Sequence, residues 1–203
     1  ESENFDISVE WYYGDDSYLQ SDLGLDSGLD RRYGVDLNWT VNEKIAAYAM
    51  LGREKIDSRT KGSSTFTTAD WVGRVQDDFE TYGAGVNAQF TDKIGVNLDY
   101  SYGAGNSRTR ITGAGDGIFP VVKSELSSFK AGVTYGFSER TDLRLTWWYE
   151  TLTTSDWSYD AQPAAMPTVL GLGVDPYNYD VNYVTLSMSY RFGGPKATEA
   201  AAE

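Results

Sequence analysis

The side chains that could do chemistry in this chain are mainly carboxylates, because its 203 residues contain 30 Asp and Glu but no histidine and no cysteine. Without histidine there is no imidazole with a pKa near neutrality, which closes the Ser/His and Asp/His mechanisms of many hydrolases. A hydrolase built on two carboxylates needs a pair at a defined separation, and no pair stands out. The sequence therefore predicts no catalytic residues and no enzyme activity.

Two acidic groups could gather calcium through hard oxygen ligands. They lie in or beside expected loops and comprise Asp22, Asp26 and Asp30, and Asp70, Asp77, Asp78 and Glu80. Their spacing matches no known calcium loop, so solvated loop charge is the favoured interpretation and no metal site is predicted. The glycine-rich segments 103–110 and 171–175 lack the strand-to-helix context that a phosphate loop requires. No cofactor bound by this chain is predicted.

The formal net charge of −13 excludes one class of partner. Proteins that bind nucleic acid present a basic footprint to the phosphate backbone. We therefore expect no nucleic-acid partner, whereas a basic or haem-bearing protein partner remains open.

Four aromatic residues recur about every 50 residues, and each closes a run in which every second side chain is apolar. They are Trp39, Phe90, Phe137 and Phe192. In the last run, Leu186 and Met188 alternate with Ser187 and Ser189. A greasy face that ends at a fixed height, backed by a polar or small face, is typical of a transmembrane β-barrel with an aromatic girdle.

The alternation predicts eight strands of about 9 to 11 residues, the length that a tilted strand needs to cross a bilayer. Rising strands start near Phe5, Ile45, Ile94 and Leu143. Three connections are short, at 41–44, 91–93 and 138–141, and four are long and polar, at 19–28, 56–76, 107–121 and 160–178. The fold class is therefore all-β, a transmembrane antiparallel up-and-down β-barrel. It occupies 1–192 as four hairpins, followed by a disordered polar tail at 193–203.

Membrane barrels place short turns in the periplasm and long loops outside. This rule predicts a bacterial outer-membrane location with both termini periplasmic, and a periplasmic girdle formed by the four recurring aromatic residues. The outer girdle is expected to comprise Trp11, Tyr13, Tyr102, Trp147 and Tyr149.

Charged residues at the alternate positions are expected to face the lumen. They are Glu10, Arg32, Asp36, Asp99, Lys130, Arg144, Glu150 and Arg191. They could line an open lumen, form ion pairs that fill a small barrel, or contact a plug. Inward glycines, among them Gly83, Gly85 and Gly132, are expected to leave room inside. A soluble β-sandwich, or a soluble barrel with apolar residues inside, also shows alternation, but the paired aromatic heights and the long-short loop alternation favour the membrane barrel.

From residue 71 to residue 192 the chain resembles the C-terminal part of the MtrB/PioB family of outer-membrane barrels associated with decahaem cytochromes. The matching stretches are TYGAGVNAQFTDKIGVNLDYSYGAG at 81–105, YGFSERTDLRLTWWYE at 135–150, DW at 156–157, VLGLG at 169–173 and YVTLSMSYRF at 183–192. Their order and spacing together carry the resemblance.

The resemblance implies a sleeve that holds a periplasmic multihaem c-type cytochrome across the outer membrane for extracellular electron transfer. Haem is then expected on the partner cytochrome, which agrees with the absence of the cysteines and histidines that attach and ligate c-type haem. Further expected partners are outer-membrane lipid and the barrel-assembly machinery. The terminal aromatic strand resembles the signal that this machinery recognises.

The number of strands in the complete barrel distinguishes two possible functions. Family barrels have many more strands than eight, so the sleeve requires this chain to be a fragment of a larger barrel. Eight strands alone close around a core of side chains. The alternative is thus an autonomous small eight-stranded outer-membrane barrel acting as a pore, adhesin or membrane anchor.

Overall fold

The computed structural model describes residues 4–18, 22–114, 117–156 and 178–192, and these form one antiparallel β-sheet. Its strands are β1 (Phe5–Ser17), β2 (Gly24–Asn42), β3 (Ile45–Gly62), β4 (Trp71–Thr91), β5 (Ile94–Gly113), β6 (Gly117–Ile118), β7 (Val122–Ser138), β8 (Thr141–Ser155) and β9 (Tyr179–Tyr190). The described residues contain no helix long and apolar enough to cross a membrane.

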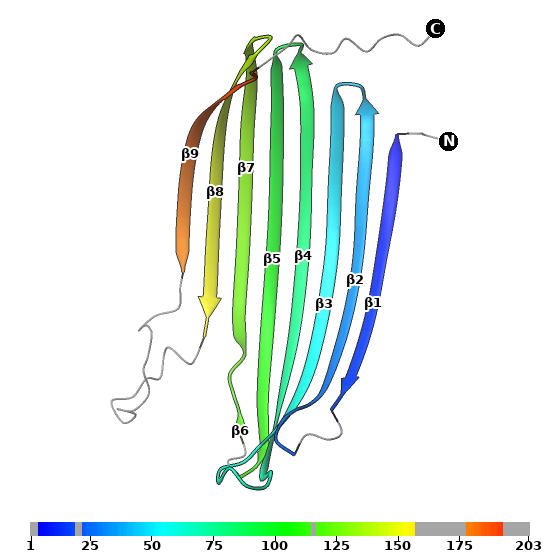
Figure 1. Ribbon diagram of the computed structural model, residues 1–203, viewed down its shortest axis with the longest axis vertical. Helices are drawn as coiled ribbons and strands as arrows, with labels where there is room; N and C mark the ends of the chain where they lie inside the picture. Colours follow the sequence, from blue (N-terminus) through cyan, green and yellow to red (C-terminus); the bar gives the residue numbers. More distant parts are fainter. Residues whose placement is uncertain (1–3, 19–21, 115–116, 157–177, 193–203) are drawn as a thin grey trace.

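Each long strand pairs with the next one along the chain, in the order β1-β2-β3-β4-β5-β7-β8-β9 (Figure 1). This is the up-and-down order that the sequence predicts, and the eight long strands match the eight expected ones. The two-residue strand β6 pairs only with β5 and lies within the expected loop 107–121.

The three short turns share one construction. The side-chain oxygens of Asn42, Thr91 and Ser138 accept hydrogen bonds from the backbone N–H two residues on, at 2.9, 3.2 and 3.3 Å. Such Asx and Ser/Thr turns replace a backbone turn with a local side-chain bond. A register shift precedes each turn, so Phe90 and Phe137 lie at β-bulges.

The strands are longer than the sequence predicts. Expected loops 19–28, 56–76 and 107–121 are partly strand, since β2 begins at Gly24, β3 ends at Gly62, β4 begins at Trp71 and β5 ends at Gly113. Bilayer thickness sets only the minimum length of a strand, and polar side chains can continue a ladder into water. The loop 160–178 and the tail 193–203 lie almost wholly or wholly outside the described residues.

The sheet is a single layer. None of the described apolar side chains is buried, and large ones such as Leu186 and Val9 are 74% and 72% exposed. A soluble sandwich would cover one face with a second sheet, and no such layer exists among the described residues.

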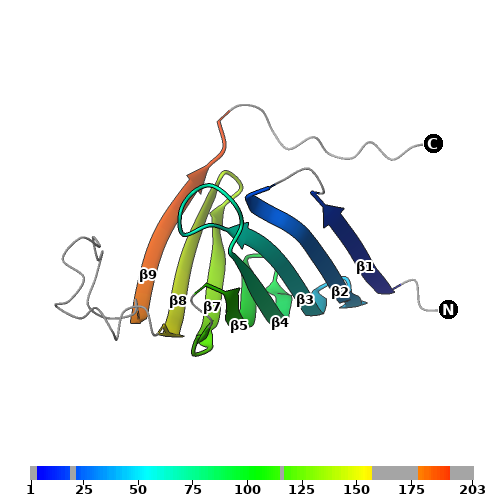
Figure 2. The ribbon, with the colours of Figure 1, turned by 90° about the horizontal axis from the view of Figure 1, so that it is seen from below.

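The sheet is also open. Its path ends at β1 on one side and β9 on the other, and these two strands do not pair within the described part of the chain. Seen along the strands, the sheet is a curved wall with β1 and β9 at its two edges (Figure 2). The start of β1, the end of β9 and the three short turns lie at the same end of this wall (Figure 1).

Candidate functional site

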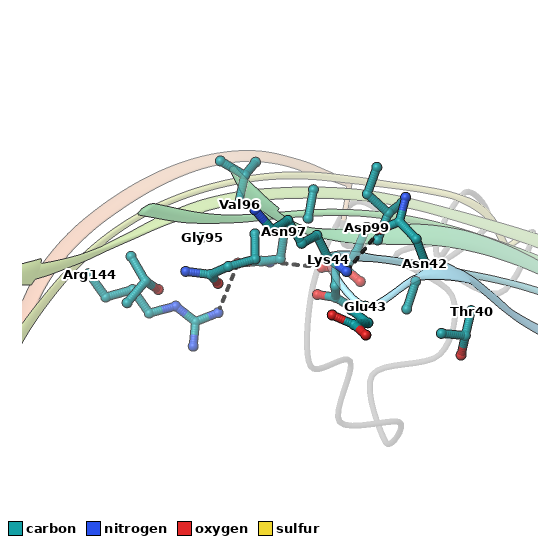
Figure 3. A pocket seen from close by; sticks show the side chains of 15 residues that line it. Thr40, Asn42, Glu43, Lys44, Gly95, Val96, Asn97, Asp99 and Arg144 are labelled. Carbon is teal, nitrogen blue, oxygen red and sulfur yellow. Dashed lines mark hydrogen bonds between the residues drawn. The ribbon is translucent and has the colours of Figure 1, made fainter. Parts of the chain in front are cut away.

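The strand register sorts side chains onto two faces, because residues paired across strands point the same way. Ile7 pairs with Leu37 and Leu37 with Ala49 on one face, whereas Asp36 pairs with Met50 on the other. The eight charged residues expected to face inward all fall on the second face. Figure 3 shows Asn97 and Arg144 beneath the arch of the sheet, on its concave side, with Val96 pointing from the opposite face.

A chain of hydrogen bonds crosses the concave face near the short turns. Tyr48 Oη donates to Asp99 Oδ1 at 2.9 Å, Asn97 Nδ2 donates to Asp99 Oδ2 at 3.0 Å, and Arg144 Nη2 donates to Asn97 Oδ1 at 3.2 Å. The members come from β3, β5 and β8, with Tyr48 reaching across β4. Tyr48 and Asn97 were not predicted as site residues, although their alternation with outward-facing residues was a usable signal.

Side chains of neighbouring strands cover three of the inward glycines. A Cβ on Gly85 would lie 2.3 Å from Tyr48 Cε1, one on Gly83 would lie 2.6 Å from Met50 Cε, and one on Gly132 would lie 2.2 Å from Asn97 Oδ1. Side chains of the neighbouring strands therefore lie flat across these glycines. The glycines still keep the wall thin, because the side chains above them do not project from it.

A second cluster lies on the concave face of β7, β8 and β9. Lys130 Nζ stands 4.4 Å from the centre of the Trp148 ring, and Trp148 Nε1–H donates to Ser128 Oγ at 2.8 Å. Tyr183 packs edge-on to Trp148 with ring centres 6.5 Å apart. This part of the inner face is aromatic as well as polar, which the polar-or-small pattern of the sequence understates.

Other inward charges pair within the wall. Arg32 Nε donates to Glu54 Oε1 at 3.2 Å, and its guanidinium lies 5.8 Å from the centre of the Tyr12 ring. Tyr179 Oη donates to Glu150 Oε1 at 2.8 Å.

At the end of the wall with the short turns, Arg191 pairs with Asp142. Arg32 and Arg191 thus each form an ion pair within the wall, with Glu54 and Asp142.

The convex face carries an apolar band. We call the residues of the expected periplasmic girdle the inner aromatic row and those of the expected outer girdle the outer aromatic row. Between these two rows, the outward positions on the described strands hold no charged residue. On β5 this band runs from Ile94 to Tyr102. Eight steps of about 3.4 Å from residue to residue, at a tilt of about 40°, span about 21 Å along the membrane normal, close to the roughly 25 Å of membrane barrels.

The inner aromatic row crosses the strands obliquely. Trp39 on β2 shares a register row with Val184 on β9, through Ala47, Val86, Leu98, Ala131 and Trp147. Phe192 lies eight residues beyond Val184, so the row slips by eight residues over six strand-to-strand steps. With about 3.4 Å per residue along a strand and about 4.8 Å between strands, the line through the aromatic residues is inclined by about 43° to the line of register partners across the sheet.

The outer aromatic row slips in the same direction. Trp11 on β1 shares a register row with Thr153 on β8, and Trp147 lies six residues from Thr153 towards the short turns. Six residues over six steps correspond to about 35°. Strands of membrane barrels tilt by roughly 35–45°, so both rows run as lines of constant height would on such a wall.

Two of the acidic residues weighed as calcium ligands form ion pairs with cations of neighbouring strands. Asp26 pairs with Arg59 and Lys61, and Asp78 pairs with Arg53 and Lys55. No group of three Asp, Glu, His or Cys able to hold a metal exists among the described residues.

The family of outer membrane beta-barrel porins MtrB/PioB matches residues 1–192. The chain belongs to the MtrB/PioB family. The match extends the resemblance from residue 71 back to the start of the chain. The outer membrane protein MtrB of Shewanella baltica (strain OS185) is 26% identical over 191 residues, which cover 93% of this chain and 28% of that protein. The chain thus spans less than a third of this relative, as expected for a C-terminal part of such a protein.

Solved structures share the fold. The copper transporter OprC superposes with a TM-score of 0.60 at 14% identity, over 92% of this chain and 30% of that one. The ferric preacinetobactin receptor BauA of Acinetobacter baumannii does so with 0.57 at 13% identity, over 93% and 35%. The described strands are therefore part of an outer-membrane barrel wall, and the family to which the chain belongs is porin-like.

Proposed function

We propose that this chain is part of a sleeve that holds a periplasmic multihaem c-type cytochrome across the outer membrane for extracellular electron transfer. Membership of the MtrB/PioB family supports the barrel, and the open wall supports a wide one. Eight long strands occupy only 28% of the relative's length. If the rest is built alike, the wall exceeds the 16–18 strands at which porins already leave an aqueous channel.

The observation that carries the proposal is that side chains on the concave face lie flat and that their polar atoms bond to one another. Tyr48, Asn97 and Met50 lie flat over glycines, and the polar atoms of Tyr48, Asp99, Asn97 and Arg144 bond to one another. A wall whose polar groups are already paired presents few unsatisfied atoms to an incoming protein. A thin, polar wall whose hydrogen-bonding groups already have partners suits a protein plug that must enter and fill the lumen.

Electron transfer itself belongs to the partner in this proposal. These 203 residues hold neither the cysteines nor the histidines that attach and ligate c-type haem. The wall contributes an insulating enclosure, with its apolar band against outer-membrane lipid. We propose the orientation that places the short turns, the start of β1 and the end of β9 in the periplasm, following the loop rule of such barrels.

An autonomous eight-stranded barrel would pair β1 with β9, and these strands are the two unpaired edges of the described sheet. We therefore favour the sleeve over a small pore, adhesin or anchor.

The sleeve is tested by thickening its inner face in the full-length barrel. Gly85→Phe and Gly132→Phe are expected to drive Tyr48 and Asn97 into the lumen and to abolish retention of the cytochrome. Their matched controls, Ala84→Phe and Ala131→Phe, add the same bulk to the lipid-facing side of the same strands. The measurements are cytochrome retained per barrel and reduction of a dye inside vesicles by an external donor.

Single alanine substitutions of Glu10, Asp36, Lys130 or Glu150 are expected to leave transfer nearly unchanged, because no one contact carries the enclosure. One such substitution that abolished transfer while the complex still assembled would contradict a passive sleeve. Equal loss of cytochrome in the glycine and alanine series would contradict the proposed inner face.

A further inference from the structure

Positive charge gathers on the convex face beyond the outer aromatic row. Nine of the chain's 17 Lys and Arg lie there on β2–β7, and we call them the outer basic patch. They are Arg31, Arg53, Lys55, Arg59, Lys61, Arg74, Arg108, Arg110 and Lys123. The acidic residues on the same face of these strands are Asp26, Asp57, Asp78, Glu80 and Glu125. The patch is therefore net positive in a chain whose net charge is −13.

A row of three arginines lies at the centre of the patch. Arg59 pairs in register with Arg74, and Arg74 with Arg110, on the adjacent strands β3, β4 and β5. Like charges directly opposite each other destabilise a sheet. Asp57 Oδ1 accepts from Arg74 Nε at 2.8 Å, but the exposed Arg110 has no ion pair or side-chain hydrogen bond among the described residues. Arg59, Arg74 and Arg110 line a groove that could hold a further anion.

A second groove lies one row nearer the membrane. Arg31, Lys55 and Arg108 line it together with Asp57, Asp77 and Asp78, and Arg31 Nε is buried without a hydrogen-bond partner. Buried donors without partners are rare and costly. Arg108 is exposed and forms no ion pair with the described residues.

The height of these arginines selects the kind of anion. Arg108 and Arg110 lie six and eight residues beyond Tyr102 on β5, about 16 and 21 Å along the normal at a 40° tilt. Phospholipid headgroups extend only about 5–8 Å beyond the hydrocarbon on each side. A phospholipid therefore reaches only the lower cations, such as Arg53 and Lys55, whereas a lipid with a large phosphorylated sugar headgroup reaches both grooves.

We propose that the outer basic patch binds the phosphate groups of lipopolysaccharide, the phosphorylated glycolipid of the outer leaflet; this rests on the proposed orientation of the wall. Guanidinium groups bind phosphate through paired N–H donors. Bound phosphate relieves the repulsion along Arg59, Arg74 and Arg110. The lipid thereby covers the polar extensions of β3, β4 and β5 that rise above the apolar band.

The test uses the full-length barrel with Arg108→Gln and Arg110→Gln together. Neither side chain has a bond with the described residues that folding could depend on, and the folded fraction is checked by its heat-modifiable mobility in gels. The matched control, Lys93→Gln with Arg140→Gln, removes the same charge at the short turns. Each barrel is reconstituted into phosphatidylcholine vesicles with added lipopolysaccharide, either intact or enzymatically dephosphorylated, and the glycolipid retained per barrel is measured.

We expect the Arg108/Arg110 variant to retain several-fold less intact lipopolysaccharide than the wild type and the control. We also expect the wild type to retain the dephosphorylated form as poorly as the variant retains the intact form. Equal retention by variant and wild type, or equal retention of the intact and dephosphorylated lipid by the wild type, would overturn the proposal.

Loss confined to the Lys93/Arg140 control would overturn the orientation and with it the proposed site. Cytochrome retention, measured on the same samples, reports on the sleeve independently of the lipid.

Discussion

Val133 and Thr134 are neighbours on β7 that point to opposite faces of the wall. Val133 pairs with Val96 and Leu145 within the apolar band, and Thr134 pairs with Gly95 and Arg144 on the concave face. The two positions are adjacent on one strand and lie at nearly the same depth, so they differ mainly in the medium that each side chain meets. They form a matched pair for measuring what the convex face contacts.

We expect Val133→Arg to destabilise the full-length barrel by about 2–4 kcal/mol, because a charge on the lipid-facing side near the midplane is poorly solvated. Thr134→Arg is expected to cost far less, since the concave face is polar and the added charge meets only the like charge of Arg144 on the neighbouring strand. Urea unfolding in lipid vesicles measures both free energies of unfolding. Equal costs at the two positions would contradict the placement of lipid on the convex face.

At the scale of elements, β3 and β4 continue well beyond the apolar band through pairs of opposite charge. Asp78 accepts from Arg53 Nη2 at 2.8 Å and lies 3.4 Å from Lys55 Nζ, while Asp57 accepts from Arg74 and Gln76. The hydrogen bond from Arg53 holds the pKa of Asp78 below its ordinary value, and the hydrogen bond from Arg74 does so for Asp57. Protonation of these carboxylates at low pH is therefore expected to weaken the extended parts of β3 and β4.

A carboxyl group whose pKa is lowered on folding stabilises the fold above its ordinary pKa, near 4, and this contribution is lost as pH falls through the lowered pKa. We expect amide exchange in residues 53–61 and 72–80 to accelerate below about pH 4, once corrected for the intrinsic rate. Exchange in the apolar band should remain slow. Asp78→Asn should weaken the acid response around Arg53, and an unchanged response would show that these pairs do not hold the extension together.

At the scale of the whole molecule, the two edges decide whether the wall is complete. β1 and β9 each pair on one side only within the described sheet. The chain also spans 28% of its MtrB relative. Unpaired edges invite association with other chains, so the remaining wall is expected to lie between these two strands.

We expect cysteines at Val9 and Leu186 to remain uncrosslinked within one monomer of the full-length barrel when a short bifunctional reagent is added. Cysteines at Val9 and Val35, which are register partners on β1 and β2, should crosslink efficiently. Gel mobility after denaturation measures both. Efficient crosslinking of Val9 to Leu186 in a monomer would instead favour a closed eight-stranded barrel.

The sequence by itself determined the features that depend on neighbours along the chain. Alternation in runs such as 184–192 assigned faces because successive side chains of a strand point to opposite sides. The short turns at 41–44, 91–93 and 138–141 followed from polar, turn-forming residues between apolar runs. Strand number, order and direction were therefore readable from the sequence, as was family membership from motifs such as YVTLSMSYRF.

Only the tertiary structure decided the features that depend on register between strands. The slip of the aromatic rows, the flat packing of Tyr48 over Gly85, and the convergence of Arg59, Arg74 and Arg110 each join residues from separate strands. The length of β3 and β4 was also hidden, because a polar run reads as loop until its partners across the sheet are known. Alternation assigns a face to each residue, but a shift of two residues preserves every face while replacing every neighbour, so pairing had to be seen in three dimensions.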